Sequence, residues 1–364
     1  MERRKRISFT VINDLSYDQR MQRICQSLSE AGYEVSLIGR TLPTSKALPS
    51  FPYHCIRLKP WFKRGALFYL EYNIRLFFFL LFYKVDVLGA VDLDTLLANS
   101  LVAKLRAKKL VYDAHEYFTE VPELQGRKKV QAVWEKVARF GIPKASLCYT
   151  VSPGLAELFQ KNYGKSFAVI RNLPLVKEIK SLEKPEPPVV LYQGALNKGR
   201  CLEHLIAAVD GLPVQLWIAG EGDLSASLRE QAKEGIAKGQ IKFLGFLQPK
   251  ELHELSPQAW LGFNVLENMG LSYYYSLANK TFDYIQAEVP VMCSEFPEYL
   301  SLASEYPAII FAEPSTESVK HQIQTLLNDP KLYQNLKTAC KEASAKWNWE
   351  QESKHLLSLY EQII

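Results

Sequence analysis

Residues 189–209 read VVLYQGALNKGRCLEHLIAAV, and this stretch shows the alternation that runs through the whole chain. It starts with a run of apolar residues, continues through a turn that contains Gly194 and Gly199, and ends in an amphipathic segment. Short apolar runs of this kind are typical of parallel strands buried on both faces, with helices between them. The stretch therefore predicts a strand followed by a helix, the unit from which α/β folds are built.

The alternation extends in both directions. Strands are predicted at residues 7–12, 35–38, 55–58, 85–90, 110–112, 147–151, 167–170, 189–192, 214–219, 241–244, 260–266, 289–293 and 308–311. Residues 171–188 contain four prolines and many charges, which is typical of a linker. We therefore predict an α/β protein with one Rossmann-like domain at 1–170 and a second at 189–345, followed by a C-terminal segment at 346–364. Ligands of such sheets bind beyond the carboxyl ends of the strands, so the site is expected in the cleft between the domains.

The composition is that of a globular protein, because 48% of the 364 residues are apolar and 23% are charged. The six cysteines have no metal-ligand spacing and are expected to be reduced thiols. The opening MERRKRISFTVI runs from a basic tip into a strand without an apolar signal-peptide core. A cytoplasmic protein is therefore expected.

Charge is divided unevenly along the chain. Residues 1–170 hold 26 Lys and Arg against 15 Asp and Glu, whereas residues 171–364 hold 18 against 24. A basic first half fits an anionic partner such as a membrane surface, a lipid phosphate or nucleic acid, and ordinary variation of surface charge is the alternative. No nucleic-acid-binding module is recognisable, so nucleic acid is not expected as a partner.

Residues 60–84, PWFKRGALFYLEYNIRLFFFLLFYK, form the most hydrophobic segment. The unbroken apolar run inside it is far shorter than the ~20 residues that span a bilayer. Lys63, Arg64, Arg75 and Lys84 flank the aromatic residues, as in helices that lie at the surface of an anionic membrane. A core helix packed on the sheet is the alternative, and the sequence leaves both interpretations open.

The stretch VYDAHEY places Asp113, His115 and Glu116 directly after a predicted strand. A histidine there can hydrogen-bond a substrate hydroxyl or titrate near neutral pH, and a purely structural histidine is the alternative. The D-x-D pattern of Asp92 and Asp94 begins an apolar helix. We interpret these two residues as helix caps, and no metal site is expected.

The first predicted strand is followed by NDLSYDQR, a turn that leads into a helix. It presents Asn13, Asp14 and Asp18, with Arg20 on the helix. The free N–H groups and the positive end of such a helix suit a ligand, although Asp18 is equally explained as an N-cap.

Two turns of the second domain combine glycine with charge. The turn after residue 193 carries Gly194, Lys198 and Arg200, which suits a diphosphate because glycine lets the backbone approach and the cations neutralise charge. It does not match the P-loop pattern of ATPases. The following LWIAGEGDL repeats the arrangement with Gly220 and Glu221.

Residues 264–291, NVLENMGLSYYYSLANKTFDYIQAEVPV, connect two predicted strands. Glu267 begins a loop that carries the tyrosines 273–275, Asn279 and Lys280, and the next helix is expected to start close to Thr281. Asp283 in the first turn of that helix is placed to accept hydrogen bonds from a ribose. Three tyrosines in an exposed loop are expected to contact a ligand.

In this order, the motifs DQRMQRICQSLSEAGYEVSLI, VYDAHEY, VSPGLAELF, VIRN, GALNKGR, IAGEGDL, IKFLGFLQPKEL and LANKTFDYIQAEVPV resemble the retaining, nucleotide-sugar-dependent glycosyltransferases of family 4. The resemblance covers nearly the whole chain. It implies the GT-B fold, two Rossmann-like domains with a cleft between them, and a final helix, supplied by residues 346–360, that crosses back to the first domain. The implied reaction transfers a sugar from a UDP- or GDP-sugar to a glycan or lipid-linked acceptor, without metal or other cofactor, in a cytoplasmic protein that contacts the inner face of the membrane.

The resemblance also implies residue roles. The implied catalytic residues are His115, Arg200 and Lys280. The implied donor-binding residues are Gly194, Lys198, Arg200, Gly220, Glu221, Phe246, Glu267, Tyr275, Asn279, Lys280 and Asp283. The implied acceptor-binding residues are Asn13, Asp14, Asp18, Arg20, Asp113 and Glu116.

The sequence departs from the family pattern at two positions. Ala195 stands where the family has an arginine, and Tyr275 stands where the family has the first glutamate of its Glu-x7-Glu signature, whose second position is Asp283. These departures leave two alternatives open: a catalytically silent protein of the same fold that acts as a membrane-associated partner, and a nucleotide-sugar epimerase.

Overall fold

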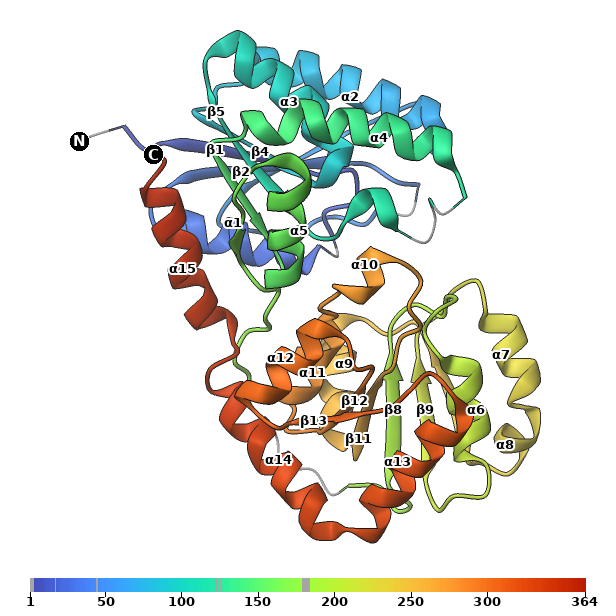
Figure 1. The fold of residues 1–364 in the computed structure, drawn as a ribbon. Coiled ribbons are helices and arrows are strands. Elements are labelled where there is room, and N and C mark those ends of the chain that lie inside the picture. The colour runs from blue at the N-terminus through green and yellow to red at the C-terminus, as the bar shows by residue number, and fades with distance from the viewer. Residues whose placement is uncertain (1–2, 17, 44, 122–123, 125, 179–183) are drawn as a thin grey trace. The chain divides into compact units, whose positions relative to one another are not determined.

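The computed structural model describes residues 3–16, 18–43, 45–121, 124, 126–178 and 184–364, and it divides into two compact α/β units (Figure 1). Unit 1 comprises Met1–Asn172 and Glu352–Ile364, and unit 2 comprises Leu173–Gln351. Part of the predicted linker at 171–188, residues 179–183, lies outside the described residues. The remainder of that segment from residue 173 onward belongs to unit 2.

Unit 1 is built on a seven-stranded parallel sheet in the order β3-β2-β1-β4-β5-β6-β7. Its strands are β1 (Arg6–Thr10), β2 (Glu34–Arg40), β3 (His54–Leu58), β4 (Val87–Val91), β5 (Lys109–Ala114), β6 (Leu147–Thr150) and β7 (Ala168–Val169). Its helices are α1 (Gln19–Glu30), α2 (Gly65–Phe82), α3 (Asp92–Arg106), α4 (Lys128–Gly141) and α5 (Pro153–Tyr163). Short 3-10 turns are η1 (Phe118–Glu120) and η3 (Ile142–Lys144). β4 is buried along its whole length, as a parallel strand covered on both faces requires.

Unit 2 repeats the architecture with six parallel strands in the order β10-β9-β8-β11-β12-β13. The strands are β8 (Val189–Gln193), β9 (Gln215–Ala219), β10 (Ile241–Gly245), β11 (Leu261–Asn264), β12 (Val291–Cys293) and β13 (Ile309–Phe311). The helices are α6 (Leu202–Val209), α7 (Ser225–Gln231), α8 (Lys233–Ala237), α9 (Pro249–Leu255), α10 (Leu271–Tyr274), α11 (Asn279–Gln286), α12 (Pro297–Glu305), α13 (Thr316–Asn328) and α14 (Pro330–Ser344), with the 3-10 turn η4 (Ser256–Gln258). In chain order this is the doubly wound 3-2-1-4-5-6 arrangement, whose ligands bind where the order reverses.

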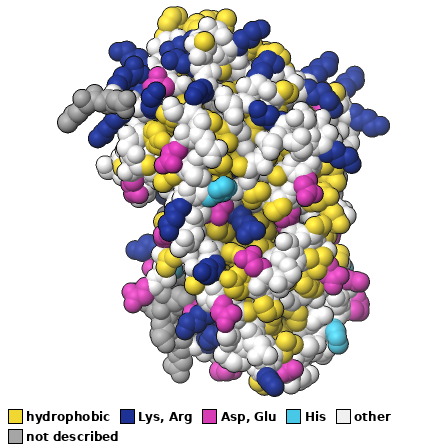
Figure 2. All heavy atoms as spheres, turned by 60° about the vertical axis from the view of Figure 1, so that its left-hand side comes forward, with side chains coloured by type: hydrophobic (Ala, Val, Ile, Leu, Met, Phe, Trp, Pro, Cys, Tyr) yellow, Lys and Arg dark blue, Asp and Glu magenta, His cyan; other side chains and the backbone are white. Residues whose placement is uncertain are grey.

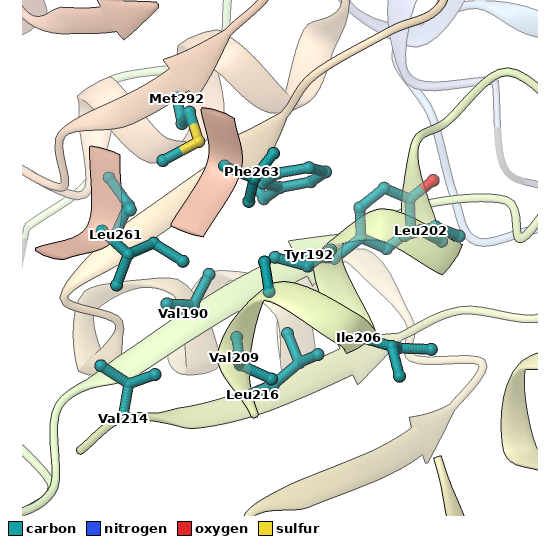
Figure 3. Close-up of a cluster of buried hydrophobic side chains, with 14 of the residues drawn as sticks. Val190, Tyr192, Leu202, Ile206, Val209, Val214, Leu216, Leu261, Phe263 and Met292 are labelled. Carbon is teal, nitrogen blue, oxygen red and sulfur yellow. The ribbon is translucent and has the colours of Figure 1, made fainter. Parts of the chain in front are cut away.

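The core of unit 2 fixes the end of its first strand. Side chains of β8, β9 and β11 meet those of α6, as Val190, Leu216, Phe263 and Ile206 show in Figure 3. On the other side, Tyr284 of α11 lies against Gly262, where a Cβ would come within 2.3 Å of the ring. The Tyr284 hydroxyl donates to the Leu191 carbonyl at 2.9 Å and accepts from the Gln193 N–H at 3.1 Å. The strand end that leads into the turn at 194–200 is therefore held from both faces.

The last helix, α15 (Trp349–Glu361), packs in unit 1 from Glu352 onward. The Arg171 N–H donates to the Glu352 carboxylate at 2.6 Å. Tyr360 is fully buried, its hydroxyl lies 3.2 Å from that of Tyr149, and its ring centroid lies 6.3 Å from that of Phe9. The C-terminus thus supplies part of the core on which β1 and β6 depend.

The predicted α/β class with two Rossmann-like sheets is confirmed, and each predicted strand overlaps an observed one. The segment with three tyrosines differs from the prediction. Tyr273 and Tyr274 belong to the short helix α10, Tyr275 follows it, and all three are half-buried. Tyr274 packs on Phe296 with the ring centroids 5.3 Å apart, so packing accounts for an aromatic that the sequence placed in an exposed loop.

We expect Tyr360→Ala to lower the free energy of unfolding of unit 1 by about 3–5 kcal/mol, because it leaves a cavity beside Phe9 and Tyr149. Tyr360→Phe removes one hydroxyl contact and should cost about 1 kcal/mol. Chemical denaturation followed by circular dichroism measures both changes. The exposed His355→Ala on the same helix is the matched control, and an equal loss in that variant would contradict the assignment.

Candidate functional site

The carboxyl ends of β8 and β11 lie side by side in unit 2, at the point where the strand order reverses. The turn 194–200 follows β8, and the loop 265–278 follows β11. Backbone contact joins the two segments, since the Glu267 N–H donates to the Gly199 carbonyl at 3.0 Å. This edge of the sheet is where an open parallel sheet binds ligands.

Two glycines allow these segments to approach closely. Gly199 has φ of +78°, and a Cβ there would lie 2.4 Å from the Met269 sulfur. Gly220, after β9, has φ of +152°, and a Cβ would lie 1.8 Å from the Gly194 carbonyl oxygen. A side chain at position 220 would force the turns apart, so Gly220 is required by close backbone packing. Gly199 is favoured by its positive φ and by the nearby Met269 and Tyr273 side chains.

Arg200 and Lys280 bring two positive charges to this edge, and each lies over an aromatic ring. The Arg200 guanidinium carbon is 4.8 Å from the ring centre of Tyr273, and the Lys280 Nζ is 3.9 Å from that of Tyr192. Neither cation forms an ion pair with a carboxylate of the described residues. The Arg200 Nε is buried, and no hydrogen-bond partner for it occurs in the described part of the chain.

The pKa of Lys280 is lowered in this environment. Burial and the positive charge of Arg200 lower the pKa of Lys280 well below its usual value, and Cys293 and Asp283 oppose the shift. A cation–π contact supplies partial compensation, but it does not neutralise the ammonium group. An anionic ligand placed against both cations would do so, and it would raise the pKa of Lys280.

A buried polar network positions Lys280. Asn264, the last residue of β11, donates through Nδ2 to Thr281 Oγ1 and to the Tyr299 hydroxyl, both at 2.9 Å. The Tyr299 hydroxyl also accepts the N–H of Ala278 at 3.1 Å. These contacts fix the first turn of α11, which begins at Asn279, so the Lys280 side chain leaves a rigid backbone.

Asp283 is held one turn further along α11. Gln193 Nε2 donates to Asp283 Oδ2 at 3.2 Å, and the Ser256 hydroxyl donates to Gln193 Oε1 at 3.1 Å. The carboxylate is half-buried beside the end of β8. Sequence reasoning missed Gln193, although its place at the end of a buried strand was the signal that could have found it.

The other predicted donor-site residues divide into two groups. Glu267 is half-buried, and its backbone contact with Gly199 brings it to the turn at 194–200. Lys198, Glu221, Phe246 and Asn279 are exposed, and Glu221 forms an ion pair with Arg229. Tyr275 stacks edge-on against Tyr274 with the ring centroids 5.1 Å apart.

In unit 1, a buried ion pair lies beneath the strand ends. Arg20 Nη2 and Nε donate to the two carboxylate oxygens of Asp113 at 2.8 and 3.2 Å, and Arg20 Nη1 donates to the Ile170 carbonyl at 2.9 Å. Both side chains are almost fully buried. The contact of Arg20 and Asp113 with an acceptor stays a prediction, and in this structure each of the two side chains is paired with the other. Asp113 also contacts a third residue of the candidate site.

That residue is His115. Its Nε2 lies 3.2 Å from Asp113 Oδ2, its Nδ1 lies 3.5 Å from Asp92 Oδ2, and its N–H donates to Asp92 Oδ1 at 2.9 Å. Burial lowers the pKa of His115, but Asp92 and Asp113 outweigh burial and raise it to about 9. The expected titration near neutral pH is thus not supported, and His115 is a cation at pH 7.

Asp92 is a site residue that sequence reasoning interpreted as a cap. The N-cap of α3 is Val91, without a side-chain cap hydrogen bond, and the Asp92 carboxylate instead holds the backbone and ring of His115. Asp92 also has φ of +52°, a strained conformation for a non-glycine residue. Asp94 is buried, and burial raises its pKa well above the ordinary value. The VDLD pattern places Asp92 at the end of a predicted strand, and this position was the sequence signal that could have identified it.

The remaining acceptor candidates form the turn after β1. Asp18 is the N-cap of α1 and accepts the N–H of Met21 at 3.0 Å, and it also accepts from Asn13 Nδ2 at 2.8 Å. Asp14 pairs with Arg57 at 2.6 Å. Glu116 is exposed next to His115. Asn13, Asp14 and Asp18 therefore shape the turn. Within the described residues, no group of three or more His, Cys, Asp or Glu side chains could hold a metal ion.

We expect an NMR titration of the His115 ring to give a pKa of about 9. Asp92→Asn should lower this pKa, because it removes the carboxylate that stabilises the imidazolium most strongly and leaves the ring equally buried. Glu116→Gln, which changes an exposed neighbouring charge, is the control and should produce a smaller shift. An unchanged pKa in Asp92→Asn would contradict the arrangement.

The same pKa predicts how stability depends on pH. Its value is raised from 6.5 in the unfolded chain to about 9 in the folded protein. The stabilisation is therefore complete below pH 6.5 and is lost as the pH rises through about 9. Urea denaturation at a series of pH values should show this loss in the wild type, and His115→Gln should show it less.

Two family models match the chain. The model described as Glycosyltransferase Family 4 matches residues 19–173, and the model described as Glycosyl transferases group 1 matches residues 176–343. A comparison with curated proteins gives no match. The two matches divide at the point where unit 1 gives way to unit 2.

Several solved structures are similar over nearly the whole chain. Sucrose-phosphate synthase from Thermosynechococcus elongatus is 18% identical, with a TM-score of 0.77 and 99% of each chain covered. Anabaena Alr3699/HepE, in complex with UDP and glucose, is 14% identical, with a TM-score of 0.75 and coverage of 98% of this chain and 100% of the other. A putative UDP-N-acetylglucosamine 2-epimerase from Listeria monocytogenes is 12% identical, with a TM-score of 0.66 and coverage of 98% and 95%. At these identities the likeness shows a shared fold.

Proposed function

The chain belongs to the group 1 and family 4 glycosyltransferases with a GT-B fold, and from this premise we propose its reaction. It transfers a hexose from a UDP- or GDP-sugar to a glycan or lipid-linked acceptor, and the anomeric configuration is retained. Unit 2 binds the donor, and unit 1 binds the acceptor. No metal or other cofactor takes part in the proposed reaction.

One observation carries the proposal. Arg200 and Lys280 lie at the ligand-binding edge of unit 2 over Tyr273 and Tyr192, without a carboxylate partner among the described residues. A nucleoside diphosphate supplies the missing negative charge, and its charge grows as the bond to the sugar breaks. Cations held in a dry site stabilise such a developing charge more than they stabilise the ground state. The pair therefore suits a leaving group of this kind.

The remaining contacts of the donor follow from the same edge. We assign Asp283, which accepts a hydrogen bond from Gln193, to the ribose hydroxyls. Gly194 and Gly220 bring the two turns together, since a Cβ on Gly220 would lie 1.8 Å from the Gly194 carbonyl oxygen, and we assign the turn 194–200 to the donor phosphates. Glu267, brought to the turn by its contact with Gly199, is the carboxylate we assign to the sugar in place of the glutamate that Tyr275 replaces.

The reaction balances without a protein nucleophile. The bond between the anomeric carbon and the phosphate oxygen breaks, and its electron pair leaves with the diphosphate. The acceptor hydroxyl oxygen forms the new bond on the same face, and its proton passes to the leaving phosphate. His115, whose pKa is about 9, contributes positive charge beside the acceptor rather than acting as a base, and its two ring nitrogens face Asp92 and Asp113.

A catalytically silent protein is the second candidate, and the departures at Ala195 and Tyr275 favour it. Ala195 is exposed, and its carbonyl accepts a hydrogen bond from the Tyr192 hydroxyl at 2.6 Å. An arginine side chain is thus missing from the turn. Arg200 and Lys280 provide two cations in the same region, which supports activity.

An epimerase is the third candidate, and its reaction needs acids and bases around one sugar carbon.

Donor binding can be tested by thermal unfolding with UDP, GDP and their sugar conjugates. A ligand at 100 times its Kd stabilises the folded state by about 2.7 kcal/mol. We expect one nucleotide to stabilise the wild type, and Arg200→Gln and Lys280→Gln to abolish that effect. Lys242→Gln, at an exposed position on β10, should retain most of it. Equal stabilisation of all four proteins would refute the assigned donor site.

Catalysis requires a separate assay of transfer to glycoside acceptors, with the product anomer identified by NMR. Lys280→Met keeps the apolar stem and removes the charge, so kcat/KM should fall by about 10²- to 10³-fold. Lys242→Met, an exposed lysine of β10, is the control. Donor binding without transfer to any glycoside would favour the silent protein, and conversion of the donor to its epimer would favour the epimerase.

A further inference from the structure

Helix α2 of unit 1 has two apolar faces, and only one of them is buried. Phe68, Tyr72, Leu76 and Leu80 form the buried stripe, and the Tyr72 hydroxyl donates to the Val11 carbonyl at 2.6 Å. The opposite stripe is exposed and consists of Leu67 (56% exposed), Leu70 (59%), Ile74 (49%), Phe78 (57%) and Phe82 (80%). Five large apolar side chains at helical spacing form a continuous face rather than scattered exposure.

Helix α3 extends this face. Leu97, Leu101 and Leu105 recur one turn apart and are exposed. The two helices pack together, since Asn73 of α2 donates to the Asp94 carbonyl of α3 at 2.8 Å and accepts the Ala98 N–H at 3.4 Å. We call the five residues of α2 and the three leucines of α3 the apolar surface.

The segment before α2 presents a tryptophan in a fixed position. Trp61 is 81% exposed, and the Glu71 carboxylate accepts the N–H groups of Trp61 and Phe62 at 2.9 and 2.8 Å. Arg75 donates to Glu71 at 2.6 Å and lies over the Trp61 ring, 4.4 Å from its centre. An exposed tryptophan held in this way suits the interface of a membrane, where an amphipathic ring is favoured.

Positive charge surrounds the apolar surface. Helix α4 packs beside α3, the ring of its Trp134 lies 5.1 Å from that of Tyr69 of α2, and it presents several exposed cations. The exposed cations around the surface are Lys63, Arg64, Lys84, Lys104, Arg127, Lys128, Lys129, Lys136 and Arg139. Figure 2 shows Lys and Arg side chains next to hydrophobic ones at the upper edge of its view. The acidic residues Glu71 and Glu135 are paired with Arg75 and Arg139.

We propose that this part of unit 1 docks on the surface of an anionic lipid bilayer, with the apolar surface and Trp61 in the interface and the surrounding cations on the lipid headgroups. The chemistry matches, because apolar burial and headgroup attraction act together in interfacial helices. A second copy of this chain would present the same positive charge, so the cations would repel one another.

The helix lies in the interface rather than crossing it. In the described residues, Gly65–Phe82 is one helix of 18 residues that is long and apolar enough to span a membrane, and 22% of it is buried. Its buried stripe belongs to the core, and Arg106 of α3 donates to the carbonyls of Leu80 and Tyr83 at 2.7 and 2.6 Å. Spanning would require these contacts to break, whereas docking leaves them intact.

The docked surface begins where unit 1 is proposed to bind its acceptor. Helices α2 and α3 start at the edge where β3 and β4 end, and Asp92 at the start of α3 holds His115. Arg40, at the end of β2, donates to the Lys63 carbonyl at 3.2 Å and so ties this edge to the segment that carries Trp61. This link rests on the proposed function and favours a lipid-linked acceptor; the docking itself does not depend on it.

The test is flotation of the full-length protein with vesicles of phosphatidylcholine alone or mixed with phosphatidylglycerol, without donor or acceptor. We expect binding to the anionic vesicles that falls with added salt. Leu70→Ser combined with Phe78→Ser should weaken it at least tenfold. Lys128→Gln combined with Lys129→Gln should weaken it about fivefold per charge removed. The controls Ile236→Ser and Leu300→Ser replace exposed apolar residues of unit 2 and should bind as the wild type does.

Hydrogen exchange of the wild type provides a readout that needs no variant, and residues 61–82 should be protected by anionic vesicles. Absence of binding, equal binding to neutral vesicles, or protection elsewhere would overturn the proposal. So would a dimer, detected by light scattering without lipid, that Leu70→Ser with Phe78→Ser dissociates, because the surface would then belong to a second copy. A variant of the apolar surface that loses vesicle binding but is still stabilised by the donor would show that docking and donor binding are independent.

Discussion

The placement of two basic side chains, Arg200 and Lys280, over aromatic rings at one sheet edge is the feature on which the candidate site of unit 2 depends. Burial, and after it the charge of Arg200, lowers the pKa of Lys280, so holding a lysine at this position is unfavourable for the folded state. Tyr192 and Tyr273 provide ring faces for them, the network around Asn264 and Tyr299 fixes the start of α11, and Gly262 admits the Tyr284 ring that anchors β8. A stability cost concentrated in this way is typical of a site prepared for a charged ligand.

In unit 1, the carboxyl ends of the strands hold buried carboxylates, and cations compensate their charge. Asp92 and Asp113 are carboxylates buried close together, and Arg20 and His115 compensate their charge. Arg20 lowers the pKa of Asp113 despite its burial, and the two carboxylates keep His115 protonated. The imidazolium of His115 is thus held between two carboxylates. Unit 2 has two cations without a carboxylate partner among the described residues, whereas unit 1 has cations that are paired.

The local pattern of apolar residues was sufficient to predict the fold, but it did not show which residues meet in the candidate site. Runs such as 189–192 and 87–91 are apolar because parallel strands are covered on both faces, so the sequence alone marks them. The Arg20–Asp113 pair joins residues 93 positions apart, and nothing near either residue identifies its partner. Asp92 was interpreted as a cap because a first-turn aspartate usually is one, whereas here tertiary packing turns it toward His115. The tyrosines after Gly270 were placed in a loop for the same reason, since Phe296 is distant in sequence.

Helix α2 shows why periodicity could not choose between a core helix and a surface helix. A helix that is apolar all round has no polar face to indicate its orientation, and α2 is apolar on the stripe of Tyr72 and on the stripe of Phe78 alike. The choice is made by its neighbours. Had α3 covered the second stripe, the helix would be core on both sides; instead α3 places Leu97, Leu101 and Leu105 beside it, also exposed. Burial of one stripe fixes the helix to unit 1, and exposure of the other leaves apolar area whose burial in a lipid interface is favourable.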